Sequence, residues 1–586
     1  MFYLFRLFYS FLPLHNPIGF GGADFIEIAF CLMIVSGIVI APRAARHWIA
    51  CSARTAWCIA ALALLPIALR LVLLPSHPIP TPDIYDEFGH LLVADTLLHF
   101  RFANPPLPLP QFFETFFVLQ QPTYAAIYPV GQGLMLALGE ALFGSPWAGV
   151  LISTGAFCGL CYWMLRAWTT PAWALLGGVL AVIEFGPLCG WMNNYWGGHF
   201  AAAAGCLVFG ALPRLARRPR LRDASLLGLG LFCHLLTRPY ESLFLLAAVI
   251  LFFLPSLGAF IRSARTGAFS AVISSVPKAT LAAVAMPVLF LASALGITMA
   301  QNQSVTGNWA VPPYRLSQIQ YGVPAALTFL PDPVPQRALT PQQALEYKSQ
   351  VAFRGDQPEN LASFLLRLEY RVRYYRFFFL PPLYLALPLL LFPMREFRIR
   401  WLFLTLGLFA AGVNFFPAFQ LHYIAAATCL FVLWSVLALQ RLARWSPAAA
   451  RFLIIFCAAH FVFWYGVHLF DNEPFAVALR ADETWQSINH ANPERRIEVN
   501  RELDRTPGKL LVFVRYSPLH VFQDEWVYNR ADLNTARIVW ARDLGAEENR
   551  KLMALFPGRT VFLLEPDAQP PALQPYAIIG PTASGQ

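Results

Sequence analysis

Long apolar runs recur along most of the chain and are separated by short polar connections. The runs cover residues 24–41, 56–75, 147–166, 172–190, 199–212, 279–299, 377–393, 401–417, 421–440 and 450–470. An α-helix of about 20 apolar residues crosses a hydrocarbon core of about 30 Å. The pattern therefore predicts an all-α polytopic membrane protein in which these runs are transmembrane helices.

A further apolar stretch, 224–256, is interrupted by a short polar sequence that contains Arg238, Pro239 and Glu241. Its first arm has about 13 residues, or roughly 20 Å of helix, which is less than the thickness of the hydrocarbon core. We therefore expect a helical hairpin whose turn, near Arg238, lies below the outer surface of the membrane.

Basic residues gather in five short connections, which carry seventeen Arg and Lys against only Asp223 and Glu396. They are Arg43, Arg46, Arg54, Arg214, Arg217, Arg218, Arg220, Arg222, Arg262, Arg265, Lys278, Arg395, Arg398, Arg400, Arg441, Arg444 and Arg451. Cytoplasmic loops of membrane proteins are enriched in Lys and Arg, so these connections are predicted to be cytoplasmic. The loops 76–146 and 300–376, the Arg238 turn and the tail are then predicted to lie on the outer side.

Counting crossings from these loops predicts about 12 transmembrane helices within residues 24–470. The stretch 131–143 is short for a span and is expected to lie along the outer interface.

Residues 1–23 are aromatic and lack the small-residue cleavage site of a signal peptide, so we expect an interfacial segment. Residues 471–586 are expected to form an extracytoplasmic domain.

Labelling of single cysteines tests this topology. In a chain whose natural cysteines are replaced, cysteine at positions 220 and 264 is expected to react from the cytoplasmic side, and cysteine at positions 340 and 520 from the outer side. The reason is the basic excess of the loops that contain positions 220 and 264. If these two positions react from opposite sides, the hairpin at Arg238 is wrong.

Composition supports a membrane protein and excludes several other classes. The 586 residues are 57% hydrophobic and 13% charged, whereas soluble domains are about 45–50% apolar and about 25% charged. The net charge of +10 is accounted for by the cytoplasmic loops, so no nucleic-acid partner is implied. The ten cysteines lie in or beside apolar runs and imply no disulfide framework.

The tail differs from the rest of the chain in its pattern. Residues 510–516, 536–543 and 559–566 have the composition of strands, and 545–556 that of a helix. We therefore expect residues 471–586 to form a small α/β domain.

The first outer loop contains an acidic cluster. If Thr81 caps a helix, then Asp83, Asp86, Glu87 and His90 fall at i, i+3, i+4 and i+7 on one helical face. A solvated acidic face, a general base and a metal site are all compatible with this spacing. A protein-only zinc site would need more His or Cys. A divalent metal is therefore possible but not favoured, and no cofactor is firmly implied.

Other polar residues are predicted to lie at the outer ends of spans. Arg238 is an ionisable group at membrane depth, which indicates either anion binding or a local pair with Glu241. The further candidates for substrate binding are Asn194, His199, Arg371, His422 and Tyr423. A structural histidine is the simpler interpretation of His422, and an interfacial anchor that of Arg371.

One part of this pattern resembles a known superfamily. The Asp86-Glu87 pair follows an early span and is followed by Pro-rich sequence and by YPVGQGLMLALGEALFG at 128–144. This arrangement is similar to that of the GT-C polytopic glycosyltransferases, in particular the bacterial relatives of the family 39 protein O-mannosyltransferases and the lipid A aminoarabinose transferases. The similarity in organisation covers roughly residues 56–440.

The resemblance implies a fold and a reaction. It implies that a sugar moves from a polyprenyl-phosphate donor in the membrane to a glycan, glycolipid or protein acceptor at the periplasmic face, with inversion. The catalytic role of the Asp in the family's Asp-Glu pair transfers to Asp86, with Glu87 beside it. Arg238, His422 and Tyr423 occupy plausible positions for holding the lipid phosphate. The resemblance also implies that the protein lies in the cell (inner) membrane.

The main alternative is a transporter or flippase for a lipid-linked or anionic substrate. Transporters favour structural repeats and sites at the bilayer midplane, whereas the polar candidates here lie at outer ends of spans. A noncatalytic scaffold whose tail binds a partner is a third possibility. Consumption of the lipid-phosphate donor by purified protein would favour the enzyme, and movement of the intact lipid would favour the flippase. Neither, together with a stable tail-dependent complex, would favour the scaffold.

Overall fold

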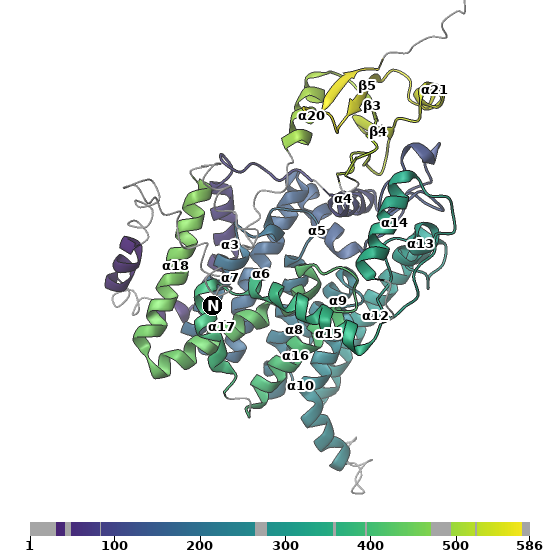
Figure 1. Ribbon diagram of the computed structural model, residues 1–586. Helices are drawn as coiled ribbons and strands as arrows, with labels where there is room; N and C mark the ends of the chain where they lie inside the picture. Colours follow the sequence, from purple (N-terminus) through teal and green to yellow (C-terminus); the bar gives the residue numbers. More distant parts are fainter. Residues whose placement is uncertain are drawn as a thin grey trace, which may run out of the picture.

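A computed structural model describes residues 31–40, 48–82, 84–263, 278–355, 359–392, 395–469, 494–521 and 524–576. A large helical body carries a small sheet domain at one end (Figure 1). The longer helices of the body are α3 (Thr55–Val72), α6 (Pro146–Trp168), α7 (Pro171–Phe185), α8 (His199–Arg217), α9 (Leu221–Thr237), α10 (Ser242–Ser263), α12 (Lys278–Thr306), α16 (Phe397–Val413), α17 (Thr428–Trp445) and α18 (Pro447–Leu469).

The helical body has the character of a multi-pass membrane protein. Among the described residues, six helices are long and apolar enough to cross a membrane. They are Thr55–Val72, Pro146–Trp168, His199–Arg217, Thr280–Thr306, Leu421–Trp445 and Pro447–Gly466. The predicted number of about 12 spans is not confirmed, because α7, α9 and α16 and the apolar part of α10 are shorter.

The core of the body is formed by α6, α8 and α17, which are largely buried, whereas α3 and α12 present apolar side chains outward. Close packing in this core requires glycine. A Cβ atom at Gly205 would lie 1.9 Å from the carbonyl oxygen of Ala426, and one at Gly149 would lie 1.9 Å from that of Met135. Gly149 thereby lets α5 (Val130–Phe143) rest directly on α6.

The prediction of one continuous helix over 377–393 is wrong for the described part. The structure has three short 3-10 helices, η5 (Arg373–Phe378), η6 (Pro381–Leu385) and η7 (Leu387–Leu390). Pro381, Pro382 and Pro388 lack the backbone N–H that an α-helix needs, and each ring clashes with the preceding turn. Hydropathy alone does not register this interruption.

The helix that carries the acidic cluster begins later than the sequence predicts. The helix α4 spans Tyr85–Leu98, and Ile84, not Thr81, is its N-cap. A carboxylate oxygen of Glu87 accepts a hydrogen bond from the backbone N–H of Ile84 at 3.4 Å. This contact satisfies an otherwise unpaired donor at the helix start. Asp83 lies outside the described residues.

The body also contains shorter elements between the long helices. They are η2 (Pro110–Phe112), β1 (Val118–Leu119), β2 (Ala125–Ala126), η3 (Gly190–Met192), α13 (Pro313–Tyr321), α14 (Pro341–Arg354), α15 (Leu361–Val372) and η8 (Leu421–Ala427). The strands β1 and β2 pair antiparallel. Residues 131–143, which the sequence predicts to lie along the outer interface, form most of α5.

The C-terminal domain is a four-stranded sheet between helices. Its elements are α20 (Glu494–Arg505), β3 (Leu510–Val514), β4 (Ile538–Arg542), α21 (Ala546–Leu555), β5 (Thr560–Glu565) and β6 (Ala572–Pro575), and the strand order is β4-β3-β5-β6. The strand β3 is parallel to β4 and β5, whereas β6 is antiparallel. The helix α21 packs on one face of the sheet and α20 on the other. Both faces are thus covered, which explains the uninterrupted apolar run of β3.

Candidate functional site

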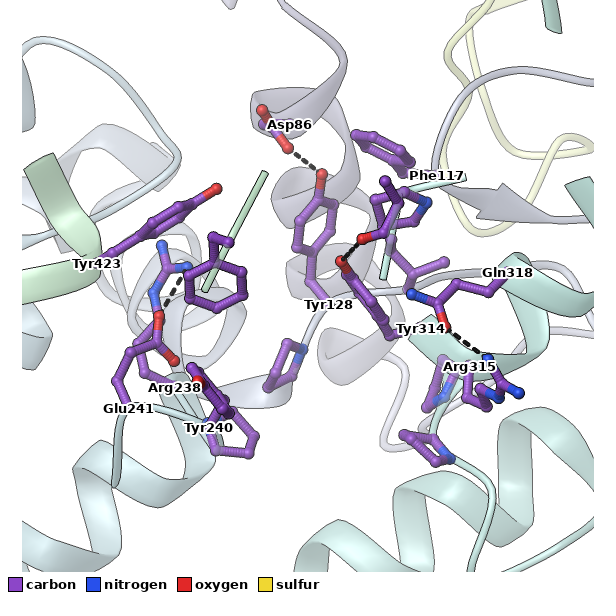
Figure 2. A pocket seen from close by; sticks show the side chains of 18 of the residues that line it. Asp86, Phe117, Tyr128, Arg238, Tyr240, Glu241, Tyr314, Arg315, Gln318 and Tyr423 are labelled. Atoms are coloured by element: carbon purple, nitrogen blue, oxygen red, sulfur yellow. Dashed lines mark hydrogen bonds and ion pairs between the residues drawn. The ribbon is translucent and has the colours of Figure 1, made fainter. Parts of the chain in front are cut away.

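A cavity of about 600 Å³ opens among α4, the α9–α10 turn, α12, α13 and the segment that precedes η8. Figure 2 shows three groups of side chains around it. Asp86 and Tyr128 form one group, and Arg238, Tyr240, Glu241 and Tyr423 form a second. Tyr314, Arg315 and Gln318 lie on the side opposite Arg238. The cavity is therefore rich in aromatic side chains and holds two carboxylates, of Asp86 and Glu241, and two guanidinium groups, of Arg238 and Arg315.

Asp86 reaches the cavity from the first turn of α4, where the helix dipole favours an anion. The hydroxyl of Tyr128 donates a hydrogen bond to its Oδ1. The walls remove the carboxyl from bulk water, and this burial raises the pKa of Asp86 to about 6, although the Tyr128 hydrogen bond and the charge of Arg238 act in the opposite direction. The side chain thus changes its protonation state close to neutral pH.

Tyr128 is held against α4 by two neighbours. A Cβ atom at Gly89 would lie 2.4 Å from the Tyr128 ring, so only glycine leaves room for it. The ring of His90 lies 4.2 Å from the Tyr128 ring, measured between centroids. Burial lowers the pKa of His90 to about 3, so the imidazole is neutral at physiological pH. Its Nδ1 has no hydrogen-bond partner among the described residues.

Replacing Tyr128 with Phe is expected to raise the pKa of Asp86 above about 6. The hydroxyl of Tyr128 stabilises the charged carboxylate, so its loss favours the protonated form. Infrared titration of the carboxyl band, assigned by its absence in Asp86→Asn, measures the shift. A control at Tyr384, whose hydroxyl bonds the carbonyl of Arg376 instead, should leave the titration unchanged. An unchanged midpoint in Tyr128→Phe would contradict the hydrogen bond.

Arg238 occupies the break between α9 and α10. It is the C-cap of α9, and Pro239 follows it, so the helix cannot continue. Its guanidinium lies over the ring of Tyr423, 5.4 Å from the centroid. The pair with Glu241 that the sequence allows is present, but its N–O distance is 3.9 Å, which is beyond hydrogen-bond range. The N–H groups of Arg238 therefore remain available to an anion in the cavity.

The structure brings five of the predicted site residues to this cavity: Asp86, His90, Arg238, His422 and Tyr423. His422 contributes an aromatic edge, since its ring lies 5.7 Å from Trp196 and 4.9 Å from Tyr423, measured between centroids.

Glu87 does not line the cavity with Asp86. Its side chain is 2% exposed, and its Oε1 accepts a hydrogen bond from the backbone N–H of Tyr195 at 2.9 Å. Glu87 therefore ties α4 to the 190–198 segment, and its catalytic role stays a prediction.

Asn194, His199 and Arg371 also lie outside the cavity lining. The side-chain amide of Asn194 donates to the carbonyl of Gly190 at 2.6 Å. The ring of His199 bridges the Thr154 hydroxyl and the carbonyl of Phe185 at 2.8 and 2.7 Å. Arg371 donates to four backbone carbonyls, those of Val413, Asn414, Phe416 and Pro417. These hydrogen bonds hold the surrounding backbone in place, and the predicted contact of the three side chains with substrate stays a prediction.

The sequence did not predict most of the other side chains that line the site. The principal ones are Tyr85, Tyr128, Trp196, Tyr240, Gln301, Tyr314, Arg315 and Gln318. Tyr128 begins the 128–144 stretch that carries the superfamily resemblance, which is the one signal that pointed to it. Within the described ranges, no group of three or more His, Cys, Asp or Glu is placed to hold a metal ion.

No protein-family model and no curated protein matches the chain. Among solved structures, it is similar to ArnT from Cupriavidus metallidurans in the apo state, with 12% identity and a TM-score of 0.45 over 87% of this chain and 93% of that one. It is also similar to that protein bound to undecaprenyl phosphate, with 11% identity and a TM-score of 0.44 over 86% and 92%. An Archaeoglobus fulgidus oligosaccharyltransferase matches with 13% identity and a TM-score of 0.38 over 76% and 59%.

At such identities and TM-scores these neighbours decide neither the fold nor the chemistry of this chain, which rest on its own residues.

Proposed function

We propose that the chain is a membrane glycosyltransferase that transfers a sugar from a polyprenyl-phosphate-linked donor to an acceptor at the periplasmic face, with inversion. The observation that carries the proposal is one cavity that holds both Asp86 and Arg238. A carboxylate can accept the proton that the acceptor hydroxyl loses, and a cation can bind the phosphate that remains on the lipid.

In the proposed reaction, Asp86 accepts the proton of an acceptor hydroxyl while the hydroxyl oxygen bonds to the anomeric carbon. The bond from that carbon to the phosphate oxygen breaks, and its electron pair stays with the lipid phosphate. Arg238 offsets the charge of this phosphate. Attack from the face opposite the leaving phosphate inverts the configuration. A base works best when its pKa lies near the working pH, which fits the raised pKa of Asp86.

The position of Arg238 supports a donor that is anchored in lipid. The helices α9 and α10, which meet at Arg238, are apolar, and an ionisable group between such helices is a candidate for function. A phosphate attached to a membrane lipid would approach Arg238 from the bilayer. The rings of Tyr240 and Tyr314 are fixed by hydrogen bonds from their hydroxyls to the carbonyls of Gly412 and Ala325, and they offer apolar faces to the sugar.

Purified protein in lipid vesicles tests the proposal. We expect free polyprenyl phosphate to appear from a polyprenyl-phosphate-linked sugar only when acceptor is present, as measured by mass spectrometry. The variant Asp86→Asn, inserted into the vesicles in the same amount, serves as the inactive control. Movement of intact lipid across the vesicle without its consumption would instead support a flippase and would overturn the proposal. Glycans and glycolipids compared between cells with and without the protein would identify the acceptor.

A further inference from the structure

The C-terminal domain contacts the helix that carries Asp86. Its segment 526–531, which precedes β4, lies against α4, and Figure 1 shows the domain at the end of the body where α4 and α5 lie. The ring of Tyr528 stacks on that of Phe88, with centroids 4.4 Å apart and planes 4° from parallel. Phe88 is two residues from Asp86, so the contact falls on the first turns of α4.

Polar contacts extend this interface toward the other end of α4. The backbone N–H of Ala531 donates to Oδ2 of Asp95 at 2.6 Å, and Asp95 lies in the last turn of the helix. The hydroxyl of Tyr124, on the adjoining loop, donates to the carbonyl of Asn529 at 3.0 Å. The segment therefore holds α4 at both ends.

The same segment packs behind the wall of the cavity. Tyr528 and Ala531 belong to a buried apolar cluster that also includes Tyr85 and Tyr128 at its edge. Both tyrosines line the cavity, and Tyr128 is the hydrogen-bond donor to Asp86. A shift of Tyr528 would therefore reach Asp86 through Phe88 and through Tyr128.

The C-terminal domain holds this segment rigidly. The side-chain amide of Asn529 makes two hydrogen bonds to the backbone of Trp540 in β4, at 2.8 and 2.9 Å. The guanidinium of Arg496 lies over both Phe88 and Trp526, 4.6 and 4.3 Å from their centroids. The segment is thus an extension of the sheet domain, and it transmits the position of that domain to α4.

We propose that Tyr528 is a positioning residue for Asp86, and that the C-terminal domain sets the placement of the proposed base by holding α4 and Tyr128 from outside the cavity. The kinetic part of this inference rests on the proposed function. Reacting groups must be held closely, since a displacement of about 1 Å can cost roughly 10²-fold in rate. Loss of the Tyr528 ring should therefore lower turnover while donor binding at Arg238 persists.

The test compares Tyr528→Ala, Tyr528→Phe and Arg515→Ala in the full chain. Tyr528→Ala is expected to lower kcat by about 10-fold or more with the apparent KM for donor within about 3-fold. Tyr528→Phe keeps the stacked ring and should stay within about 2-fold of the natural protein. Arg515 pairs with Asp543 and Glu565 on the surface of the same domain, so Arg515→Ala controls for general loosening of that domain.

A second readout does not depend on activity. Infrared titration of Asp86 should show a lower midpoint in Tyr528→Ala, because a displaced α4 admits water and burial is the largest cause of the raised pKa. Besides burial, the groups that shift the pKa of this carboxyl are Glu87, Tyr128 and Arg238, and the variant retains them. It also retains the other groups that face the carboxyl, which are Tyr85, Tyr314, Glu346 and Tyr423. The hydroxyl of Tyr528 also interacts with Asp86, and Tyr528→Phe isolates the effect of losing it.

The outcomes separate this inference from the proposed function. If the natural protein transfers no sugar but the Asp86 midpoint shifts only in Tyr528→Ala, the proposed function fails and the positioning role stands. An unchanged midpoint together with kcat within about 2-fold of the natural protein would overturn the positioning role. Equal losses in Tyr528→Ala and Arg515→Ala would overturn it as well, because they would reflect the stability of the domain alone.

Discussion

Asp86→Asn is expected to lower turnover by at least about 10²-fold while donor binding is largely kept. Asparagine keeps the size of the side chain and an oxygen that accepts the Tyr128 hydrogen bond, but it cannot take a proton from an acceptor hydroxyl. Single-turnover transfer to a hydroxyl acceptor, with donor binding measured separately, checks both parts. The effect should be confined to the chemical step, since Asp86 and Arg238 occupy different sides of the cavity.

Glu87→Gln is the matched control for this prediction. The amide oxygen of glutamine can still accept the backbone N–H of Tyr195, but its NH2 group cannot accept that of Ile84. Turnover should therefore fall by less than in Asp86→Asn. Near-normal turnover in a correctly inserted Asp86→Asn protein would remove Asp86 from the mechanism. A loss in Glu87→Gln as large as in Asp86→Asn would show that the neighbouring acid also acts in the reaction.

Much of the architecture could be predicted because burial imposes clear patterns on the sequence. The predicted tail strands correspond to β3, β4 and β5, since strands covered on both faces need continuous apolar runs. The short strand β6 was missed, because its sequence, Ala572–Pro575, has neither alternation nor an apolar run. The 377–393 error has the opposite cause: the run is apolar enough, but its prolines interrupt the helix.

The site was predictable only in part, because its geometry depends on tertiary placement. Charge bias placed Asp86 and Arg238 on the same side of the membrane, and the structure places both at one cavity. Adjacent residues of an α-helix point about 100° apart, so the spacing alone could not decide whether Asp86 or Glu87 faces that cavity. Tyr128, whose hydroxyl bonds Asp86, lies 42 residues away along the chain and carried no chemical signal of its own.

Arg238→Lys is expected to weaken donor binding by roughly 10-fold, and Arg238→Ala by more, because a charge-assisted hydrogen bond contributes about 1.5–3 kcal/mol. Lysine keeps the positive charge but replaces the planar fork of the guanidinium with one flexible ammonium, which does not reproduce two parallel hydrogen bonds to a phosphate. The substitution also removes the flat contact between the guanidinium and the Tyr423 ring.

The measurement is equilibrium binding of a polyprenyl-phosphate-linked sugar to purified protein, with membrane insertion checked for each variant. Arg373→Lys is the matched control, because Arg373 is an exposed arginine that lies over Tyr370, 3.8 Å from the ring centroid, and is not among the residues that line the cavity. The control should bind donor as the natural protein does. Since Asp86 stays in place in Arg238→Lys, saturating donor should restore much of the turnover, unlike in Asp86→Asn. Unchanged affinity in both Arg238 variants would mean that the phosphate is held elsewhere in the cavity, for which Arg315 on the opposite wall is the remaining guanidinium among its described lining residues.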